Sequence, residues 1–428
     1  MHNIGNIFRA LRNKNYRLFF CGQSVSLIGT WMQSIAISWL AYRMSNSIFV
    51  LGLVGFALQI PTFVLSPLAG IAADRHDRHR LLIVTQALSM LQALILAALV
   101  MSNVITIWQI VVLSIFLGTV NAFDIPIRQA FLLEMIDNKE DLGNAVALNS
   151  SMVNMARLIG PSIAGFLIAM VGEGVCFLIN GISYVAVLSS LFMMRVKKRE
   201  PAVHTADILT RIKEGVVYAY NFVPIRILLS TLGLISLVGG GLQTLMPVFA
   251  REIFRGGPQT LGVLMAATGL GALSGAVFLA SRDTVLGMGR LIGRVTIVFG
   301  LCIIAFSVSN ILALSLVLLF VAGFSMMVHM ASSNTLLQLI TEEDKRGRVM
   351  SFYTMAFMGT VPIGSIAAGS LAARSNVHIV LFGCGILCLV ASALFWKKLP
   401  VLREQIRPIY AEKGIIPQVA KGIGQVTT

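Results

Sequence analysis

The sequence reads SLIGTWMQ at residues 26–33 and SLVGGGLQ at residues 236–243, and this recurrence decides the fold. Serine, leucine, glycine and glutamine stand at the same places in both copies, which lie 210 residues apart. Leu51-Gly52 recurs as Leu261-Gly262 at the same separation. Self-similarity at a fixed separation is typical of duplicated units, so we expect two related units in this chain.

A second block extends the repeat toward the end of each unit. Residues 136–169 align to residues 340–373 at a separation of 204, and the two segments finish with PSIAGFLIA and GSIAAGSLAA. Each unit is therefore about 200 residues long, and most of the chain belongs to one unit or the other.

The composition indicates that lipid is part of the solvent. Of the 428 residues, 57% are apolar and 12% are charged, with a mean hydropathy of +0.85. Soluble domains have roughly 45–50% apolar and about 25% charged residues. A helix needs about 20 apolar residues to cross a bilayer. Twelve stretches of that kind occur, at about 16–42, 48–73, 81–102, 105–127, 142–171, 174–194, 226–249, 259–281, 291–309, 311–339, 349–373 and 377–396.

Each unit holds six of these stretches, and an even number returns the chain to the side on which it started. Both units therefore cross the membrane in the same direction, as parallel repeats related by an axis along the membrane normal. The predicted fold is an all-α membrane protein with twelve transmembrane helices in two parallel six-helix repeats.

The net charge of +15 is a signal of orientation rather than of nucleic-acid binding. With the N-terminus inside, 28 of the 33 Lys and Arg residues fall in segments on the cytoplasmic side. Four fall on the opposite side, and Arg157 lies within the fifth span. This bias follows the positive-inside rule, so both termini are predicted to be cytoplasmic and no nucleic-acid partner is expected.

The spans and the charged segments divide the chain into four parts. We expect a six-helix bundle over 1–194, a cytoplasmic connector over 195–225, a second six-helix bundle over 226–396, and a flexible cytoplasmic tail over 397–428. Within the connector, apolar residues recur every fourth position from Ile208 to Tyr220. This spacing predicts an amphipathic helix that lies along the membrane face.

The segment between the second and third spans carries charged residues at a defined spacing, with Gly70, Asp74, Arg75 and Arg78. The glycine permits close helix approach, and Asp74 can accept hydrogen bonds from a helix N-terminus. The segment resembles the signature loop of the major facilitator superfamily, Gly-x-x-x-Asp-Arg-x-Gly-Arg-Arg, but has Asp77 in place of the second glycine. The alternative interpretation is an ordinary basic loop on the cytoplasmic side.

A charged pair marks the end of the fourth span. Asp124 and Arg128 lie one helical turn apart, and Asp124 is ~27 Å along a helix from Thr106. They are predicted to lie near the cytoplasmic edge and to neutralise each other. Pro126 between them should kink or end the helix, because it lacks a backbone donor.

Arg157 lies in the middle of the fifth span. An unpaired charge there costs about 2.5–3.5 kcal/mol on insertion scales, so it should face a cavity or a partner. Kinks or close helix packing are also expected at small residues and prolines of the fifth and eleventh spans, namely Gly160, Pro161, Gly165 and Pro362.

Several runs in the first half and the connector carry a more specific resemblance. They are FDIPIRQA, LGNAVALNS, ARLIGPSIAG, CFLINGISY and EGVVYAY, between residues 123 and 220. This set resembles the third drug:proton antiporter family of the major facilitator superfamily, which holds macrolide and other drug efflux proteins and the enterobactin exporter. The resemblance covers most of the chain. It implies export of a small amphipathic solute, a drug-like compound or a siderophore, across the bacterial inner membrane in exchange for protons.

The resemblance also suggests a cytoplasmic lock. Its candidate residues are Gly70, Asp74, Arg75, Arg78, Asp124 and Arg128. In this hypothesis, Asp74 docks at the N-terminus of the eleventh span, around residues 348–349, and Arg78 pairs with Asp124. These contacts would hold the outward-open state and break when the transporter opens inward.

Titratable side chains within the spans are scarce. Asp124 and His329 are the candidates for carrying a proton. The alternatives are a purely structural role for Asp124 and an ordinary hydrogen-bonded histidine at position 329.

Polar residues on the predicted spans are candidates for a solute cavity between the two halves. They are Gln33, Gln59, Asn121, Asn154, Arg157, Asn180, Gln243, Asn334 and Gln338. Adaptable apolar contacts for a bulky amphipathic solute would come from Phe56, Phe63, Phe324, Met326 and Met327. Each of these residues, taken singly, is also compatible with ordinary helix packing.

Other classes of function lack their motifs in this sequence. No Gly-Lys dipeptide occurs, which excludes the phosphate loop of an ATP-driven pump. No His-Glu-x-x-His, Gly-x-Ser-x-Gly or paired intramembrane aspartates mark an enzyme. The five cysteines lack paired metal spacing, so neither a metal nor a cofactor is expected. An importer and a non-transporting sensor or scaffold stay open as alternatives on this fold, and a monomer is expected.

Overall fold

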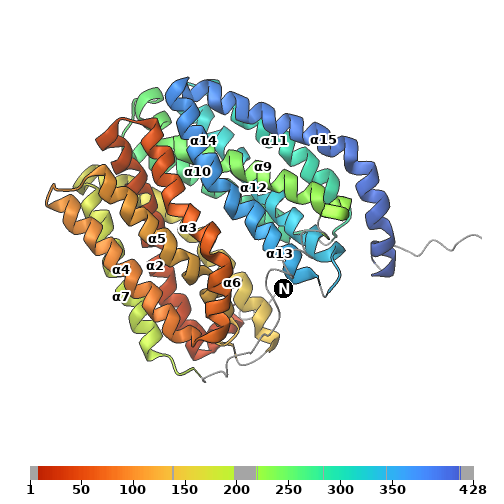
Figure 1. Ribbon diagram of the computed structural model, residues 1–428, viewed down its shortest axis with the longest axis horizontal. Helices are drawn as coiled ribbons and strands as arrows, with labels where there is room; N and C mark the ends of the chain where they lie inside the picture. The colour runs from red at the N-terminus through yellow and green to blue at the C-terminus, as the bar shows by residue number, and fades with distance from the viewer. Residues whose placement is uncertain are drawn as a thin grey trace, which may run out of the picture.

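Long helices make up nearly all of the computed structural model (Figure 1). It describes residues 8–136, 139–196, 218, 220–282, 284–343, 345–413 and 415, and the side chains of 66–67, 70–75 and 139 lie outside this description. The predicted amphipathic helix of the connector falls almost wholly outside the described residues. The lock candidates Gly70, Asp74 and Arg75 have described backbone but no described side chains.

Six long helices form the first half. A short 3-10 turn, η1 (Arg9–Arg12), precedes them, and η2 (Lys139–Asp141) joins the fourth to the fifth. The long helices are α2 (Lys14–Ser45), α3 (Ile48–Arg75), α4 (Arg78–Met101), α5 (Ile107–Leu132), α6 (Leu142–Val171) and α7 (Glu173–Met193).

The second half also has six spans, and π-helical turns interrupt two of them. One span is α9 (Val223–Val248) continued by η3 (Phe249–Ile253), and another is α13 (Arg346–Thr354), η4 (Met355–Gly359) and α14 (Thr360–Arg374) in sequence. The remaining four are α10 (Pro258–Ala280), α11 (Met288–Val308), α12 (Leu312–Ile340) and α15 (Val377–Glu412).

Within the described residues, 11 helical segments are long and apolar enough to cross a membrane. The remaining long helix, α2, has 32 residues but carries buried polar side chains such as Gln23 and Gln33, which lower its hydropathy. With α2 as the first span, the twelve predicted transmembrane helices are present, and the predicted fold class is confirmed.

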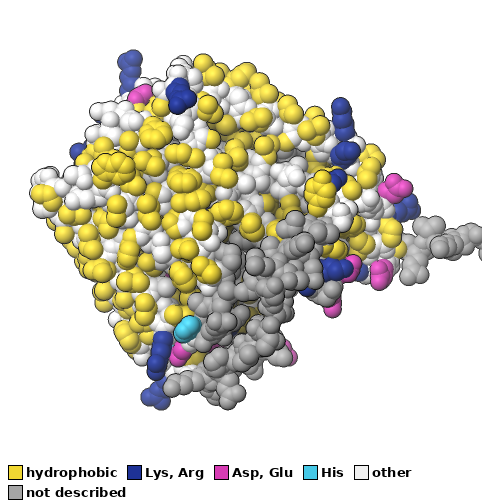
Figure 2. Space-filling view, viewed as in Figure 1, with side chains coloured by type: hydrophobic (Ala, Val, Ile, Leu, Met, Phe, Trp, Pro, Cys, Tyr) yellow, Lys and Arg dark blue, Asp and Glu magenta, His cyan; other side chains and the backbone are white. Residues whose placement is uncertain are grey.

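The surface agrees with a membrane environment. Many large apolar side chains are exposed along the helices, including Phe166, Met170, Phe192 and Val277. In the space-filling view, hydrophobic side chains cover most of the visible face, and the charged ones lie toward its edges (Figure 2). An apolar belt with charges at its rims is what a bilayer requires.

The two halves meet through two helix pairs, α3 with α14 and α6 with α10. Glycines permit both approaches. A Cβ atom added to Gly52 would lie 2.8 Å from the carbonyl oxygen of Ser365, and one added to Gly262 would lie 2.7 Å from the carbonyl oxygen of Pro161. Without side chains at these positions, the two helix backbones can come into direct contact.

These contacts obey the repeat that the sequence predicts. Gly52 packs on Gly369, and Gly262 packs on Gly165. The separation of 210 relates Gly52 to Gly262, and the separation of 204 relates Gly165 to Gly369. Exchanging the two halves therefore converts one contact into the other, which is what two parallel repeats about a twofold axis require.

The apolar core differs between the two ends of the bundle. We call the end where α2 begins and α15 ends the terminal end, and the other the closed end. At the closed end one cluster joins both halves, with Tyr42 from the first and Phe249 from the second. At the terminal end each half has its own cluster, around Phe131 and around Ile292. Among the described residues, the halves thus share a core at the closed end and not at the terminal end.

One expectation about the chain's end is wrong, and one of the two alternatives given for Pro126 is excluded. The predicted flexible tail from Lys397 is helical through Glu412, because Leu399, Leu402 and Ile406 are buried in the second half's terminal-end cluster. Pro126 does not end its helix, since α5 continues for six residues to Leu132. Neighbouring helices can satisfy a carbonyl that proline leaves without a donor, so prolines are tolerated within transmembrane helices.

Candidate functional site

A cavity of about 400 Å³ lies between the two halves. The first half contributes residues of α2, α3, α5 and α6 to its lining, and the second half contributes residues of α9 to α12, η4 and α14. This is where the sequence places a solute cavity, at the interface of the two repeats.

Five of the predicted polar residues line the cavity: Gln33, Gln59, Asn121, Arg157 and Gln243. Gln33 and Gln243 are equivalent in the repeat, so the two halves contribute matched amides. Met326 and Met327 line it as well, whereas Phe56, Phe63 and Phe324 do not.

Four other predicted residues lie away from the cavity, because their side chains have nearer partners. The amide of Asn154 donates to the carbonyl of Ser150 in its own helix, at 2.9 Å. Gln338 donates to Asn334 at 3.0 Å. Asn180 is fully buried behind the cavity, where it donates to Gln33 at 2.8 Å.

The two halves present different chemistry to the cavity. The first half lines it with hydroxyl, amide and guanidinium groups, including those of Thr30, Ser34 and Thr62. The second half contributes six methionines: Met246, Met265, Met326, Met327, Met330 and Met358. Four of these six were not among the predicted cavity residues, and one signal for them in the sequence is the count of 20 methionines.

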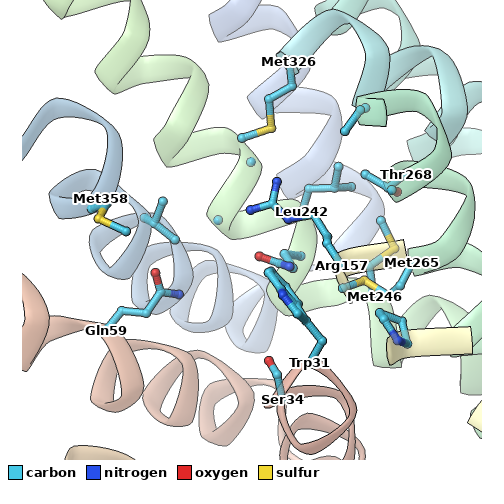
Figure 3. Close-up of a pocket in the computed structure, with 18 of the residues that line it drawn as sticks. Trp31, Ser34, Gln59, Arg157, Leu242, Met246, Met265, Thr268, Met326 and Met358 are labelled. Carbon is cyan, nitrogen blue, oxygen red and sulfur yellow. The ribbon is translucent and has the colours of Figure 1, made fainter. Parts of the chain in front are cut away.

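Arg157 is the one charged side chain among the described lining residues. Its guanidinium carbon lies 4.9 Å from the centre of the Trp31 ring, and no described carboxylate forms a salt bridge with it. Figure 3 shows the Arg157 side chain over Trp31, in the space also bordered by Gln59, Met326 and Met358. A cation–π contact is worth about 0.5–2 kcal/mol, which offsets only part of the cost of a charge in the membrane.

Gly160 allows this arrangement. A Cβ atom at Gly160 would lie 2.5 Å from the Cβ of Trp31. The glycine therefore lets α2 approach α6 closely enough for the Trp31 ring to lie beneath Arg157. This is the close packing that the sequence predicted around Gly160.

A buried hydrogen-bonded network extends behind the cavity into the first half. Gln33 accepts from Asn180 and donates to Gln92 at 2.7 Å. The hydroxyls of Thr30 and Tyr184 lie 3.3 Å apart, and Ser89 and Asn180 also interact with Tyr184. Since Thr30 and Gln33 line the cavity, the network reaches its wall.

Asp124 lies at the other end of this polar region. It is 4% exposed, and one carboxylate oxygen accepts from Thr85 at 2.9 Å and from Gln86 at 2.6 Å. The other oxygen lies 3.5 Å from the guanidinium of Arg128. The predicted pair of Asp124 and Arg128 is therefore present, and the Asp124 side chain is buried within the first half.

Arg78 contacts Glu134 in this structure rather than Asp124, the partner expected for it in the outward-open state. Arg78 donates to Glu134 at 2.9 Å, and Asp124 already has Thr85, Gln86 and Arg128 around it. Asp77, which replaces the second glycine of the signature loop, accepts from the backbone N–H groups of His79 and Arg80. It is the N-cap of α4, so this departure from the superfamily pattern has a structural role.

His329 lies inside the second half rather than at the cavity. It is buried between α11 and α12, where its Nδ1 atom is 3.0 Å from the hydroxyl of Thr296. Its Nε2 atom has no hydrogen-bond partner among the described residues. The position gives His329 no direct contact with a solute in the cavity.

Pro161 and Pro362 lie in different helical contexts. Pro161 is inside α6, which continues past it to Val171. Pro362 follows the π-helical turn η4, and its missing N–H leaves the carbonyl of Met358 without the usual helical donor. Phe357 and Met358 of this turn line the cavity, so the irregular turn shapes the cavity wall.

Polar contacts across the closed end join the two halves. The hydroxyl of Tyr42 donates to the carboxylate of Glu252, and Arg251 donates to Asn46 at 2.8 Å. The guanidinium carbon of Arg251 also lies 5.6 Å from the centre of the Tyr42 ring. The sequence predicted none of these contacts, because residues 42 and 252 are brought together only by tertiary packing.

The family model described as "Transmembrane secretion effector" matches residues 6–422 of the chain. The staphyloferrin A transporter of Staphylococcus aureus is 28% identical over 352 residues, covering 82% of this chain and 87% of the relative. The multidrug efflux pump Tap of Mycolicibacterium fortuitum is 25% identical over 390 residues, covering 88% and 93%.

A solved structure supports the fold. A bacterial homologue of the human lysosomal transporter Spinster, in an inward-facing and occupied conformation, superimposes with a TM-score of 0.68 at 13% identity. The match covers 93% of this chain and 98% of that one. The matched family and relatives are transporters and not enzymes. This chain is therefore a multi-pass membrane transporter that belongs to the transmembrane secretion effector family of the major facilitator superfamily.

Proposed function

We propose that the protein exports a small amphipathic solute from the cytoplasm across the bacterial inner membrane by alternating access, in exchange for protons. The observation that carries this proposal is the cavity between the two halves, together with a core that is shared at one end and divided at the other. A cavity sealed at one end by a shared core fits one state of an alternating-access cycle.

The charge distribution gives the direction in which this state opens. The terminal end carries the Lys- and Arg-rich segments, so the positive-inside rule assigns it to the cytoplasm. The structure then corresponds to an inward-open state, ready to receive a solute from the cytoplasm. The name of one relative, the multidrug efflux pump Tap, supports export as the direction of transport.

Asp124 is the proposed proton carrier. It is a buried carboxylate with a polar region between it and the cavity, through Thr85, Gln86 and Tyr184. Protonation would weaken its interaction with Arg128 and so change the packing of α5 near the terminal end. Coupling through this region requires no contact between solute and proton carrier.

The cytoplasmic lock belongs to the other state of the cycle. When the terminal end closes, the loop between α3 and α4 would approach the N-terminus of α13, as the resemblance suggests for Asp74. The bounds of the two bundles are proposed as the sequence indicates, and the functional unit is proposed to be a monomer.

Transport by purified protein in liposomes tests the proposal. The siderophore named for one relative, staphyloferrin A, should accumulate against its gradient only when a pH gradient is imposed. Accumulation in cells lacking the gene and in cells carrying it provides the second readout. Transport that ignores the pH gradient contradicts antiport, net uptake into cells indicates an importer, and the absence of all transport favours a sensor or scaffold.

A further inference from the structure

We infer that Arg157 binds an anionic group of the transported solute, so that the substrate class is an organic anion with an apolar body. This inference rests on the proposed function, because it takes the central cavity as the transport site. It is carried by three observations: a charge without a counter-ion, a rigid support for that charge, and an apolar wall around it.

No described carboxylate balances the positive charge of Arg157 in the cavity. The described buried and half-buried carboxylates of the first half pair elsewhere: Asp124 with Arg128, Glu134 with Arg78, Glu173 with Arg43 and Asp141 with Arg9. None of the described lining residues is acidic. A cation that faces a cavity without a described counter-ion can bind an anion through charge-assisted hydrogen bonds.

The guanidinium is held in place but keeps its donors available. Its carbon lies 4.9 Å from the centre of the Trp31 ring, so the ring stabilises the guanidinium through a cation–π contact. No hydrogen bond from Arg157 to another described residue is present in the structure. The planar fork of an arginine matches a carboxylate, sulfonate or phosphate through two parallel hydrogen bonds.

The walls around Arg157 fit the remainder of such a solute. Met326, Met327 and Met330 lie on α12, and Met246, Met265 and Met358 complete the methionine surface. Thioether side chains adapt to differently shaped apolar groups. An anion at Arg157 would therefore place the apolar part of the solute against the second half, so that one molecule contacts both halves during the cycle.

The membrane potential favours this assignment. An anion that leaves the cytoplasm moves away from the negative side of the membrane, so the potential adds to the driving force for export. Export of an anion in exchange for an entering proton is electrogenic. A neutral solute in the same exchange would carry one charge less per cycle.

Binding of two probes that differ only in charge tests the inference. 1-Naphthaleneacetate and its amide share an apolar body, and only the first carries a carboxylate. Binding to the full-length protein in nanodiscs would be measured by calorimetry for the wild type, Arg157→Gln, Arg157→Lys and the control Arg17→Gln. Arg17 is an exposed arginine of the same half, near the start of α2 and outside the cavity.

We expect the carboxylate to bind the wild type and Arg17→Gln more tightly than the amide does. Arg157→Gln should weaken carboxylate binding by at least about tenfold, because a charge-assisted hydrogen bond is lost, and should leave amide binding unchanged. Arg157→Lys should give an intermediate value, because it keeps the charge but loses the fork. Unchanged amide binding shows that the variant is folded.

Three outcomes overturn the inference: equal binding of both probes to the wild type, no binding of either at millimolar concentration, or an equal loss of both probes in Arg157→Gln. These outcomes are separate from failure of the proposed function. Arg157-dependent binding without any transport would contradict export, whereas proton-driven export that is unaffected by Arg157→Gln would contradict the role of Arg157 alone.

Discussion

At the scale of single residues, the first half concentrates the charged chemistry. Asp124, Arg128 and Arg157 are replaced at the equivalent positions of the second half by Val328, Ser332 and Val361. Arg157 and Val361 both line the cavity, so the repeat places a cation opposite an apolar side chain. Asp124 and Arg157 also differ in their contacts. Asp124 interacts with Thr85, Gln86 and Arg128, whereas the described contact of the Arg157 guanidinium is with the aromatic ring of Trp31.

Replacement of Asp124 by asparagine tests its role as proton carrier. Asparagine is of similar size and can still bond to Thr85 and Gln86, but it cannot release a proton. We expect solute exchange without a pH gradient to continue, and pH-driven accumulation in liposomes to fall by about tenfold or more.

Asp141→Asn is the matched control. Asp141 pairs with Arg9 at the terminal end, outside the cavity and its network. This control should leave pH-driven accumulation near the wild-type value. A purely structural role for Asp124 predicts a different result, in which exchange, accumulation and thermal stability all fall together.

At the scale of helices, glycines decide where the halves can touch. Gly52 and Gly369 bring α3 against α14, and Gly165 and Gly262 bring α6 against α10. The first helices of the halves, α2 and α9, instead line the cavity through Gln33 and Gln243. The pairs α3–α14 and α6–α10, and α2 with α9, thus play equivalent parts in the two halves.

Gly369→Ala should disturb the closed end. The added Cβ would lie 2.7 Å from the Cα of Gly52, and its other near neighbours, Gly52 N and Ile48 O, are backbone atoms as well, so the helices must separate. Overpacking of this kind costs about 1–3 kcal/mol. We expect longer distances between spin labels placed across the closed end, and a lower rate of export.

Gly383→Ala provides the comparison. Gly383 lies in α15, and an added Cβ there meets nothing within 4 Å. In the Gly383→Ala variant, the distances between spin labels across the closed end and the export rate should match those of the wild type. If Gly369→Ala also matched the wild type, the glycine contact would have no part in holding the closed end together.

At the scale of the whole molecule, alternation requires the closed end to open. The shared core must part there, and so must the contacts of Tyr42 with Glu252 and of Arg251 with Asn46. Arg251 and Glu252 belong to the π-helical turn η3, whose irregular backbone brings both side chains to the first half. These hydrogen bonds depend on precise geometry, whereas the apolar contacts of the shared core do not.

Tyr42→Phe should therefore shift the population toward the state that is open at this end. A hydrogen bond to a charged group contributes about 1.5–3 kcal/mol, which corresponds to a change of roughly tenfold or more in the equilibrium between the two states. Distance distributions between spin labels at the closed end, measured in nanodiscs, would report the shift.

Arg43→Gln separates this effect from a general loss of ion pairs. Arg43 makes two hydrogen bonds to Glu173, at 2.8 and 3.1 Å, at the same end of the bundle but within the first half. The Arg43→Gln substitution should leave the distances between spin labels across the closed end unchanged. An equal shift in both variants would mean that the contact of Tyr42 with Glu252 has no specific role in closure.

Several features could be predicted from the sequence because they depend on patterns along the chain. The length of the apolar stretch predicted the fifth span at 142–171, and α6 has these bounds in the structure. The repeat marked Gln33 and Gln243 as a pair, and both line the cavity. The cost of an isolated charge in lipid placed Arg157 at a cavity, because a single arginine within a span has few other solutions.

Other features were decided by tertiary structure alone. The pairing of Arg78 with Glu134, the network around Asp124 and the methionine wall depend on which helix faces meet, and an apolar span looks similar on all faces in sequence. Helix α15 continues to Glu412 because the second half offers it a buried surface. The physical reason is common to all of these. Lipid solvation selects length, hydropathy and charge along the chain, whereas close packing between helices selects the individual contacts.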